Sequence, residues 1–174
     1  MINKKCVKVV GKLYLDPFID LFNVEVISYS ISKQPTWQNI INALSEVIKT
    51  TSDCCCRRAF HSEQGWVYQM KIYEKMLKYA KIFQSMSRKG NCLDNAVVEY
   101  FFSIIKQEIF YGKTYSSYEK LKSEIEKFIK YYNETRIKQR LGFKSAFQYQ
   151  LNLIKEQKNA THSRGYIKSS KNWG

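Results

Sequence analysis

The sequence is short of the residues that build metal fingers, disulfide frameworks and membrane spans. Its two histidines, His61 and His162, lie far apart, and three of its five cysteines are consecutive at 54–56. Neither pattern has the ligand spacing of a zinc site or the distribution of a disulfide framework. No run approaches the roughly 18 apolar residues that a membrane span needs, and the first residues lack an apolar leader. These absences predict a cytoplasmic protein with free thiols and no membrane partner.

Acidic residues are also scarce relative to basic ones. The chain has 15 Asp and Glu against 29 Lys and Arg, a formal net charge of +14. Such an excess attracts polyanions, of which nucleic acid is the commonest, although a basic surface without a partner explains the charge equally well. With 174 residues, of which 44% are hydrophobic, the chain is long enough and apolar enough for one domain with a buried core.

Apolar periodicity divides the chain into strands and helices. It predicts antiparallel strands over 12–18 and 24–31, a helix over 35–48, a short strand ending at His61, a helix over 67–80 and a short strand over 82–86. Three more helices follow: one from Asp94 or Asn95 to Gly112, one from Ser116 or Ser117, and one over 145–154. This order predicts an α/β domain with a mixed sheet flanked by helices, its first strand partial or missing, and extra C-terminal helices. We assign residues 1–154 to this domain and residues 155–174 to a polar, disordered tail.

Four stretches carry a family resemblance, and they run in order over most of residues 11–150: GKLYLDPFIDLFNVEVISYSIS, FHSEQGWVYQ, SMSRKGNCLDNAVVEYFFSIIKQE and YYNETRIKQRLGFKSAFQYQ. They resemble the DDE transposases, similar to retroviral integrases, that two-frame insertion sequences encode in their downstream frame. The resemblance implies a ribonuclease-H-like fold that cleaves and transfers DNA strands. It also implies a two-metal site for Mg²⁺ or Mn²⁺, held by Asp, Asp and Glu with 35 residues between the last two.

Glu63 and Glu99 stand at the second and third positions of that pattern. Exactly 35 residues separate them, and this spacing was not built into the separate motif matches. In-line displacement at phosphorus uses two divalent ions about 3.5–4 Å apart, and Mg²⁺ prefers oxygen ligands in near-octahedral geometry. The resemblance therefore assigns Glu63 and Glu99 as catalytic residues and metal ligands.

Three basic residues are candidate DNA contacts near this site. Lys106 lies seven residues after Glu99 and so shares its helix face, while Arg88 and Lys89 precede that helix in a Gly-containing loop. Exposed loop charges explain Arg88 and Lys89 equally well. His61 is either a donor to the middle acid or a strand-end residue. Trp66 and Tyr68 either stack on an unpaired base or belong to the core.

Two departures from the family pattern concern the chemistry. Glu63 replaces the middle Asp, which displaces the carboxylate by about 1–1.5 Å. The first Asp has no counterpart, and Asn3 falls closest to its position. The next carboxylates are Asp16 and Asp20, and Asp20 belongs to a turn-forming stretch of the family. We also expect the family's upstream DNA-binding region to be missing, and the chain to be a truncated or degenerate copy.

The sequence thus predicts a transposase catalytic domain for DNA integration by metal-dependent strand cleavage and transfer, impaired or inactive because of these substitutions. The alternative is a catalytically dead fragment that binds DNA or inhibits an intact transposase; an unrelated basic α/β protein is a third. The expected partners are transposon ends, target DNA, and further copies or an intact transposase. The expected location is the nucleoid in a bacterial cytoplasm.

Overall fold

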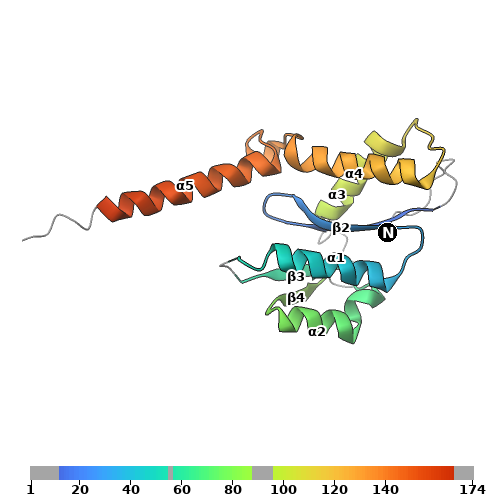
Figure 1. Ribbon diagram of the computed structural model, residues 1–174, viewed down its shortest axis with the longest axis horizontal. Coiled ribbons are helices and arrows are strands. Elements are labelled where there is room, and N and C mark those ends of the chain that lie inside the picture. The colour runs from blue at the N-terminus through green and yellow to red at the C-terminus, as the bar shows by residue number, and fades with distance from the viewer. Residues whose placement is uncertain (1–11, 55–56, 88–95, 167–174) are drawn as a thin grey trace, which may run out of the picture. The chain divides into compact units, whose positions relative to one another are not determined.

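The computed structural model describes residues 12–54, 57–87 and 96–166, with side chains as far as residue 156. The chain divides into two compact units, Met1–Phe128 and Ile129–Gly174, which are described separately. The first unit holds β1 (Tyr14–Ile19), β2 (Val26–Ser32), α1 (Trp37–Thr50), β3 (Ala59–Ser62), η1 (Trp66–Gln69), α2 (Lys71–Tyr79), β4 (Phe83–Met86), α3 (Ala96–Ile105) and η3 (Lys106–Phe110). The helix α4 (Tyr118–Glu134) begins in the first unit and ends in the second, which continues with η4 (Gln139–Leu141) and α5 (Ala146–Tyr166) (Figure 1).

β1 and β2 form the antiparallel hairpin that the sequence predicts. Their register pairs Tyr14 with Ser32 and Phe18 with Ser28. In the turn between them, a side-chain oxygen of Asp20 accepts a hydrogen bond from the backbone N–H of Phe22 at 2.8 Å. Asp20 therefore stabilises its own turn, which agrees with the structural role predicted for it.

β3 and β4 pair in parallel, with Phe60 opposite Gln84 and His61 opposite Ser85. Parallel neighbours need a long crossover, usually helical, and η1 and α2 provide it. The described strands therefore include both antiparallel and parallel pairs, as a mixed sheet requires. Within the described residues they form two separate two-stranded sheets, β1–β2 and β3–β4.

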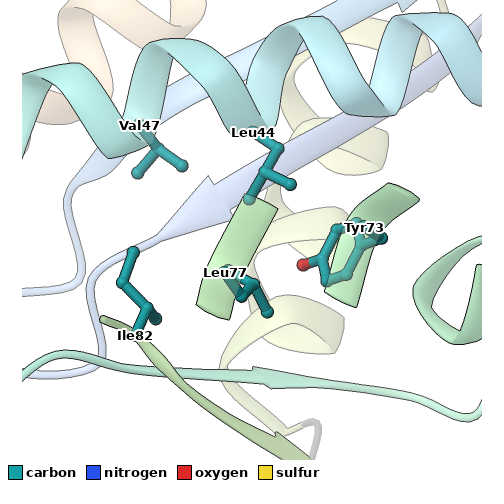
Figure 2. Close-up of a cluster of buried hydrophobic side chains, with 5 residues drawn as sticks. All are labelled: Leu44, Val47, Tyr73, Leu77 and Ile82. Carbon is teal, nitrogen blue, oxygen red and sulfur yellow. The ribbon is translucent and has the colours of Figure 1, made fainter. Parts of the chain in front are cut away.

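The core of the first unit lies beside α1. This helix packs on β1 and β2, and the Ser28 hydroxyl donates a hydrogen bond to the Ala43 carbonyl at 3.0 Å. Figure 2 shows the cluster of buried side chains that α1 shares with α2 and the residue before β4: Leu44, Val47, Tyr73, Leu77 and Ile82. Burial of these side chains supplies the main driving force for folding of this unit.

Two helices differ from their predicted form. The helix predicted over 67–80 is broken at Met70, whose extended backbone (φ −71°, ψ 138°) separates η1 from α2. The helix predicted to end at Gly112 changes to a π-helical turn at η3, and Gly112 has a φ of +73°, as a helix-ending glycine often does. Apolar periodicity does not distinguish these variants from a regular helix.

In the second unit, Ser145 begins α5 as predicted. Its hydroxyl accepts the N–H of Gln148 at 3.2 Å, and the Gln148 side chain accepts the N–H of Ser145 at 3.1 Å, which is a capping box. α5 continues to Tyr166, past residue 154, where the sequence places the start of a polar tail. The domain limits assigned from the sequence stay a prediction. None of the helices in the described ranges combines the length and hydrophobicity that crossing a bilayer requires.

Candidate functional site

A groove runs between β1 and β3 in the first unit. Among the described residues, β1 pairs with β2 alone and β3 with β4 alone, so each strand has an edge without a described neighbour. The groove has a volume of about 490 Å³. Its lining includes Leu15 to Asp20 along β1, Ala59 to Glu63 along β3, and Val97, Val98 and Phe102 of α3. Phe18 and Phe60 meet across it with ring centroids 6.1 Å apart.

β3 is anchored at its start by Arg58. The guanidinium donates hydrogen bonds to the Ile48 carbonyl at 3.3 Å, the Thr51 hydroxyl at 3.0 Å and the Ala80 carbonyl at 2.8 Å. These bonds connect the chain before β3 to the ends of α1 and α2. Because this half-buried arginine has three hydrogen-bond acceptors, it holds the start of β3 in place. The position of β3 in turn determines where Glu63, which follows the strand, begins.

Glu63 follows β3 directly and is an exposed side chain that lines the groove. The neighbouring Gln64 side chain donates to the Ser87 carbonyl at 3.1 Å, so the backbone is held on both sides of Glu63. A Cβ at Gly65 would lie 3.6 Å from Oε1 of Glu63 and 3.2 Å from Cδ2 of Tyr68. Gly65 therefore allows the Glu63 carboxylate and the Tyr68 ring to approach the same stretch of backbone closely.

Asp16 lies in the same groove, on β1. Burial raises the pKa of its carboxyl group above the usual 3.8, the hydrogen bond from Ser30 lowers it, and the negative charge of Glu63 raises it by a smaller amount than either. The Ser30 hydroxyl donates to Asp16 at 3.4 Å. Two carboxyl groups from segments distant in sequence thus line one groove. In the sequence Asp16 is only a nearby carboxylate, because its spacing gives no reason to pair it with Glu63.

Tyr68 contributes a third ionisable group to this environment. Burial, and then the charges of Asp16 and Glu63, raise the pKa of its hydroxyl to about 12. Tyr68 therefore stays protonated near neutral pH and can donate a hydrogen bond. Its ring makes an edge contact with Tyr73 at 5.4 Å, so this member of the predicted aromatic pair belongs partly to the core, whereas Trp66 is 63% exposed.

Glu99 is an exposed residue in the first turn of α3. It is not among the groove-lining residues, but Val98 and Phe102 on either side of it in sequence are. At 3.6 residues per turn, Glu99 projects about 60° around the helix from Phe102, about 100° from Val98 and about 160° from Val97. Glu99 therefore lies on the helix that borders the groove, but not on the side of that helix that lines it. The described residues contain no group of three His, Cys, Asp or Glu side chains arranged around one point as metal ligands.

The other predicted site residues lie in different parts of the structure or outside the described residues. Lys106 is half-buried at the start of η3, and its carbonyl accepts the N–H of Tyr111 at 2.9 Å. Asn3, Arg88 and Lys89 lie outside the described residues. The two ring nitrogens of His61 contact the hydroxyls of Ser85 and Ser87, each at 3.0 Å. His61 therefore links β3 to β4 and to the residue that follows β4, and both of its nitrogens are used in these contacts.

The donor set in the groove suits a hard divalent cation. Asp16 and Glu63 offer carboxylate oxygens, which Mg²⁺ and Mn²⁺ prefer. The buried Oγ of Ser62, immediately before Glu63, has no hydrogen-bond partner in the described part of the chain. Leaving a buried hydroxyl without a partner costs free energy, and this one lies at the end of β3 that precedes Glu63.

Comparison with known proteins gives matches over most of the chain. Residues 3–92 and residues 99–152 match two family models, each described as an integrase core domain. InsK of insertion sequence element IS150 from Escherichia coli (strain K12) is 47% identical over 79% of this chain and 48% of its own length. An uncharacterised transposase-like protein of Haemophilus influenzae is 41% identical over 83% of this chain and 65% of its own length. This chain therefore spans less than two thirds of either relative.

A solved structure has the same fold at low identity. The catalytic core domain of HTLV-2 integrase, solved as a trimeric form in complex with magnesium, superposes with a TM-score of 0.53 and 16% identity, over 80% of this chain and 92% of that one. At this identity the likeness concerns the fold alone. It confirms the ribonuclease-H-like fold that the sequence resemblance implies.

Proposed function

Because the chain belongs to the integrase core domain family, we propose that it is the strand-transfer core of an insertion-sequence DDE transposase, acting on transposon ends and target DNA. The observation that supports this most directly is the groove that Asp16 and Glu63 both line, together with side chains of α3, the helix that carries Glu99. The net charge of +14 suits a partner that is a polyanion.

Glu63 and Glu99 are the residues that would hold a divalent cation, Mg²⁺ or Mn²⁺. When bound, such ions supply activation of the attacking oxygen and stabilisation of the leaving one. Support comes from the family spacing, from the carboxylate donors of the groove and from the magnesium in the HTLV-2 integrase core. Asp16 joins this set as a carboxylate that the family pattern does not contain.

In this proposal, different residues of the protein have different roles. The anchored backbone around Glu63 limits how far its carboxylate can move. A cation bound in the groove would stabilise the ionised forms of both Asp16 and Glu63, which line it. The protonated Tyr68 hydroxyl can donate a hydrogen bond to a phosphate oxygen that enters the groove.

The substitutions at the acidic positions predict an impaired or inactive copy. A longer side chain at 63 misplaces the carboxylate by about 1–1.5 Å, and misplacement of this order costs about 10²-fold in rate. A second candidate function is therefore a protein that binds DNA without chemistry, or that pairs with an intact transposase and inhibits it. We further propose self-association and a location at the nucleoid.

A strand-transfer assay separates these candidates. A labelled DNA end is incubated with the full chain and a target duplex, with Mg²⁺ or Mn²⁺, beside the variant Glu99→Gln. Joined product that disappears in Glu99→Gln supports a working transferase. DNA binding without product in either metal supports the DNA-binding candidate. Absence of DNA binding would contradict both the transferase and the DNA-binding protein without chemistry.

A further inference from the structure

The turn that connects α4 to α5 in the second unit is closed by its own backbone. The Lys138 carbonyl accepts the N–H groups of Leu141 at 3.0 Å and Phe143 at 3.1 Å, and the Lys138 N–H donates to the Lys144 carbonyl at 3.0 Å. We call residues 138–144 the 138–144 turn. The Gly142 N–H adds a bond to the Gln139 carbonyl at 3.0 Å, so four backbone hydrogen bonds lie within this short segment.

The 138–144 turn contains a strained and exposed aromatic residue. Gly142 and Phe143 both have left-handed backbone conformations, with φ values of +65° and +59°. Glycine adopts this conformation without penalty, whereas a bulky residue does not. The Phe143 side chain is 68% exposed, so the free energy gained by burying it offsets little of the backbone strain. Strained residues of this kind concentrate at ligand-binding sites.

The surroundings of Phe143 are basic. Between Glu134 and Glu156 the sequence has no acidic residue. Arg140 and Lys144 are exposed within the turn, whereas Lys138 lies with its ammonium group 3.9 Å from the centroid of the Tyr132 ring. The turn therefore presents positive charge on both sides of an exposed ring.

We propose that the 138–144 turn is a second DNA contact, in which Phe143 stacks on an unpaired base and Arg140 and Lys144 contact the phosphates beside it. This inference rests on the proposed function for its ligand, and it assigns that ligand to a part of the chain that holds none of the acidic residues. Aromatic rings stack on any base, and flanking cations follow the backbone. An acidic polypeptide would satisfy the cations but would give no role to a ring held outward by strained backbone, so DNA is the better fit.

Two variants separate the ring from the backbone conformation. Phe143→Asn removes the ring but keeps a residue that tolerates the left-handed region, and Phe143→Tyr keeps the ring. Phe147→Asn is the matched control, because Phe147 is 50% exposed on the regular helix α5. Affinity is measured by fluorescence anisotropy with a single-stranded oligodeoxynucleotide, an abasic oligomer of the same length, and a labelled polyglutamate.

We expect Phe143→Asn to bind the normal oligomer on the order of tenfold more weakly than the wild type. Phe143→Tyr and Phe147→Asn should match the wild type, and all four proteins should bind the abasic oligomer equally. The melting temperature of Phe143→Asn should not fall, because the substitution removes strain and little packing. A loss of affinity in a protein that is no less stable cannot come from unfolding.

Several results would overturn the inference. Equal affinity of the wild type and Phe143→Asn for the normal oligomer removes the stacking contact, and an equal loss on the abasic oligomer does the same. Preference for polyglutamate identifies an acidic polypeptide as the ligand instead. If the wild type binds DNA and performs strand transfer while Phe143→Asn is unaffected, the inference fails and the proposed function stands. If the wild type binds no DNA, both fail.

Discussion

Glu63→Asp restores the shorter side chain that the family has at this position. The structure indicates how far the carboxylate would move. The backbone around residue 63 is held by the β3–β4 ladder on one side and by the bond from Gln64 to the Ser87 carbonyl, at 3.1 Å, on the other. The main chain therefore does not follow the shortened side chain. The carboxylate retreats by about 1–1.5 Å, away from the Gly65 backbone near which Oε1 of Glu63 now lies.

The size of the effect follows from this displacement. Misplacement of a catalytic group by about 1 Å costs about 10²-fold in rate, which corresponds to roughly 2.7 kcal/mol at 1.36 kcal/mol per tenfold. If the wild-type carboxylate is misplaced by this amount, Glu63→Asp recovers it. We therefore expect strand transfer by Glu63→Asp to be about 100-fold faster than by the wild type.

The assay is strand transfer from a labelled DNA end, with initial rates measured at saturating Mg²⁺ and again at saturating Mn²⁺. Glu63→Gln serves as the control, because it keeps the length of the wild-type side chain and removes only its charge. It should give no product above background. A Glu63→Asp rate at or below that of the wild type would refute the reasoning, since the extra methylene would then not be what limits the site.

Three further predictions concern stability. Burial, and to a smaller extent Glu63, raise the pKa of Asp16. The folded state therefore binds the Asp16 proton more tightly than the unfolded chain does. As a result, the free energy of unfolding falls as the pH rises from 3.8 through the raised pKa. Asp16→Asn should therefore be more stable than the wild type at pH 7 in denaturant titrations, and the advantage should disappear below about pH 4; equal advantage at both pH values would contradict this. Gly65→Ala places a Cβ 3.2 Å from the Tyr68 ring and should destabilise by about 1–2 kcal/mol, an effect that Tyr68→Ala should suppress in a double-mutant cycle. Gly142→Ala meets no atom within 4 Å but has a φ of +65°, so it should destabilise by about 1 kcal/mol through backbone strain alone, and an unchanged denaturation midpoint would argue against that conformation.

The local elements of the fold were accessible from the sequence because they depend on local patterns. The alternation in VEVISYSI, with Asp20 in the preceding turn, predicted the hairpin of β1 and β2. Apolar spacing around Leu44 and Val47 predicted α1, and both side chains are buried. The break at Met70 was missed, because a single extended residue leaves apolar periodicity intact on either side.

The candidate site was only partly accessible. Motif spacing pointed to Glu63, and the structure places it in a groove. Asp16 was not paired with it, because the approach of β1 to the end of β3 is a tertiary contact that no local pattern encodes. The strain at Phe143 was also missed, since Leu-Gly-Phe indicates a turn but does not reveal that two successive residues have positive φ.

Titration with Mn²⁺, followed by its electron paramagnetic resonance signal, tests most directly whether the acidic residues form one cation site. The wild-type chain is compared with Glu63→Gln and Glu99→Gln at the same protein concentration, with Glu134→Gln as a surface control. We expect the wild type and Glu134→Gln to take up the ion, and Glu63→Gln and Glu99→Gln each to take up much less. Equal uptake by all four proteins would contradict it.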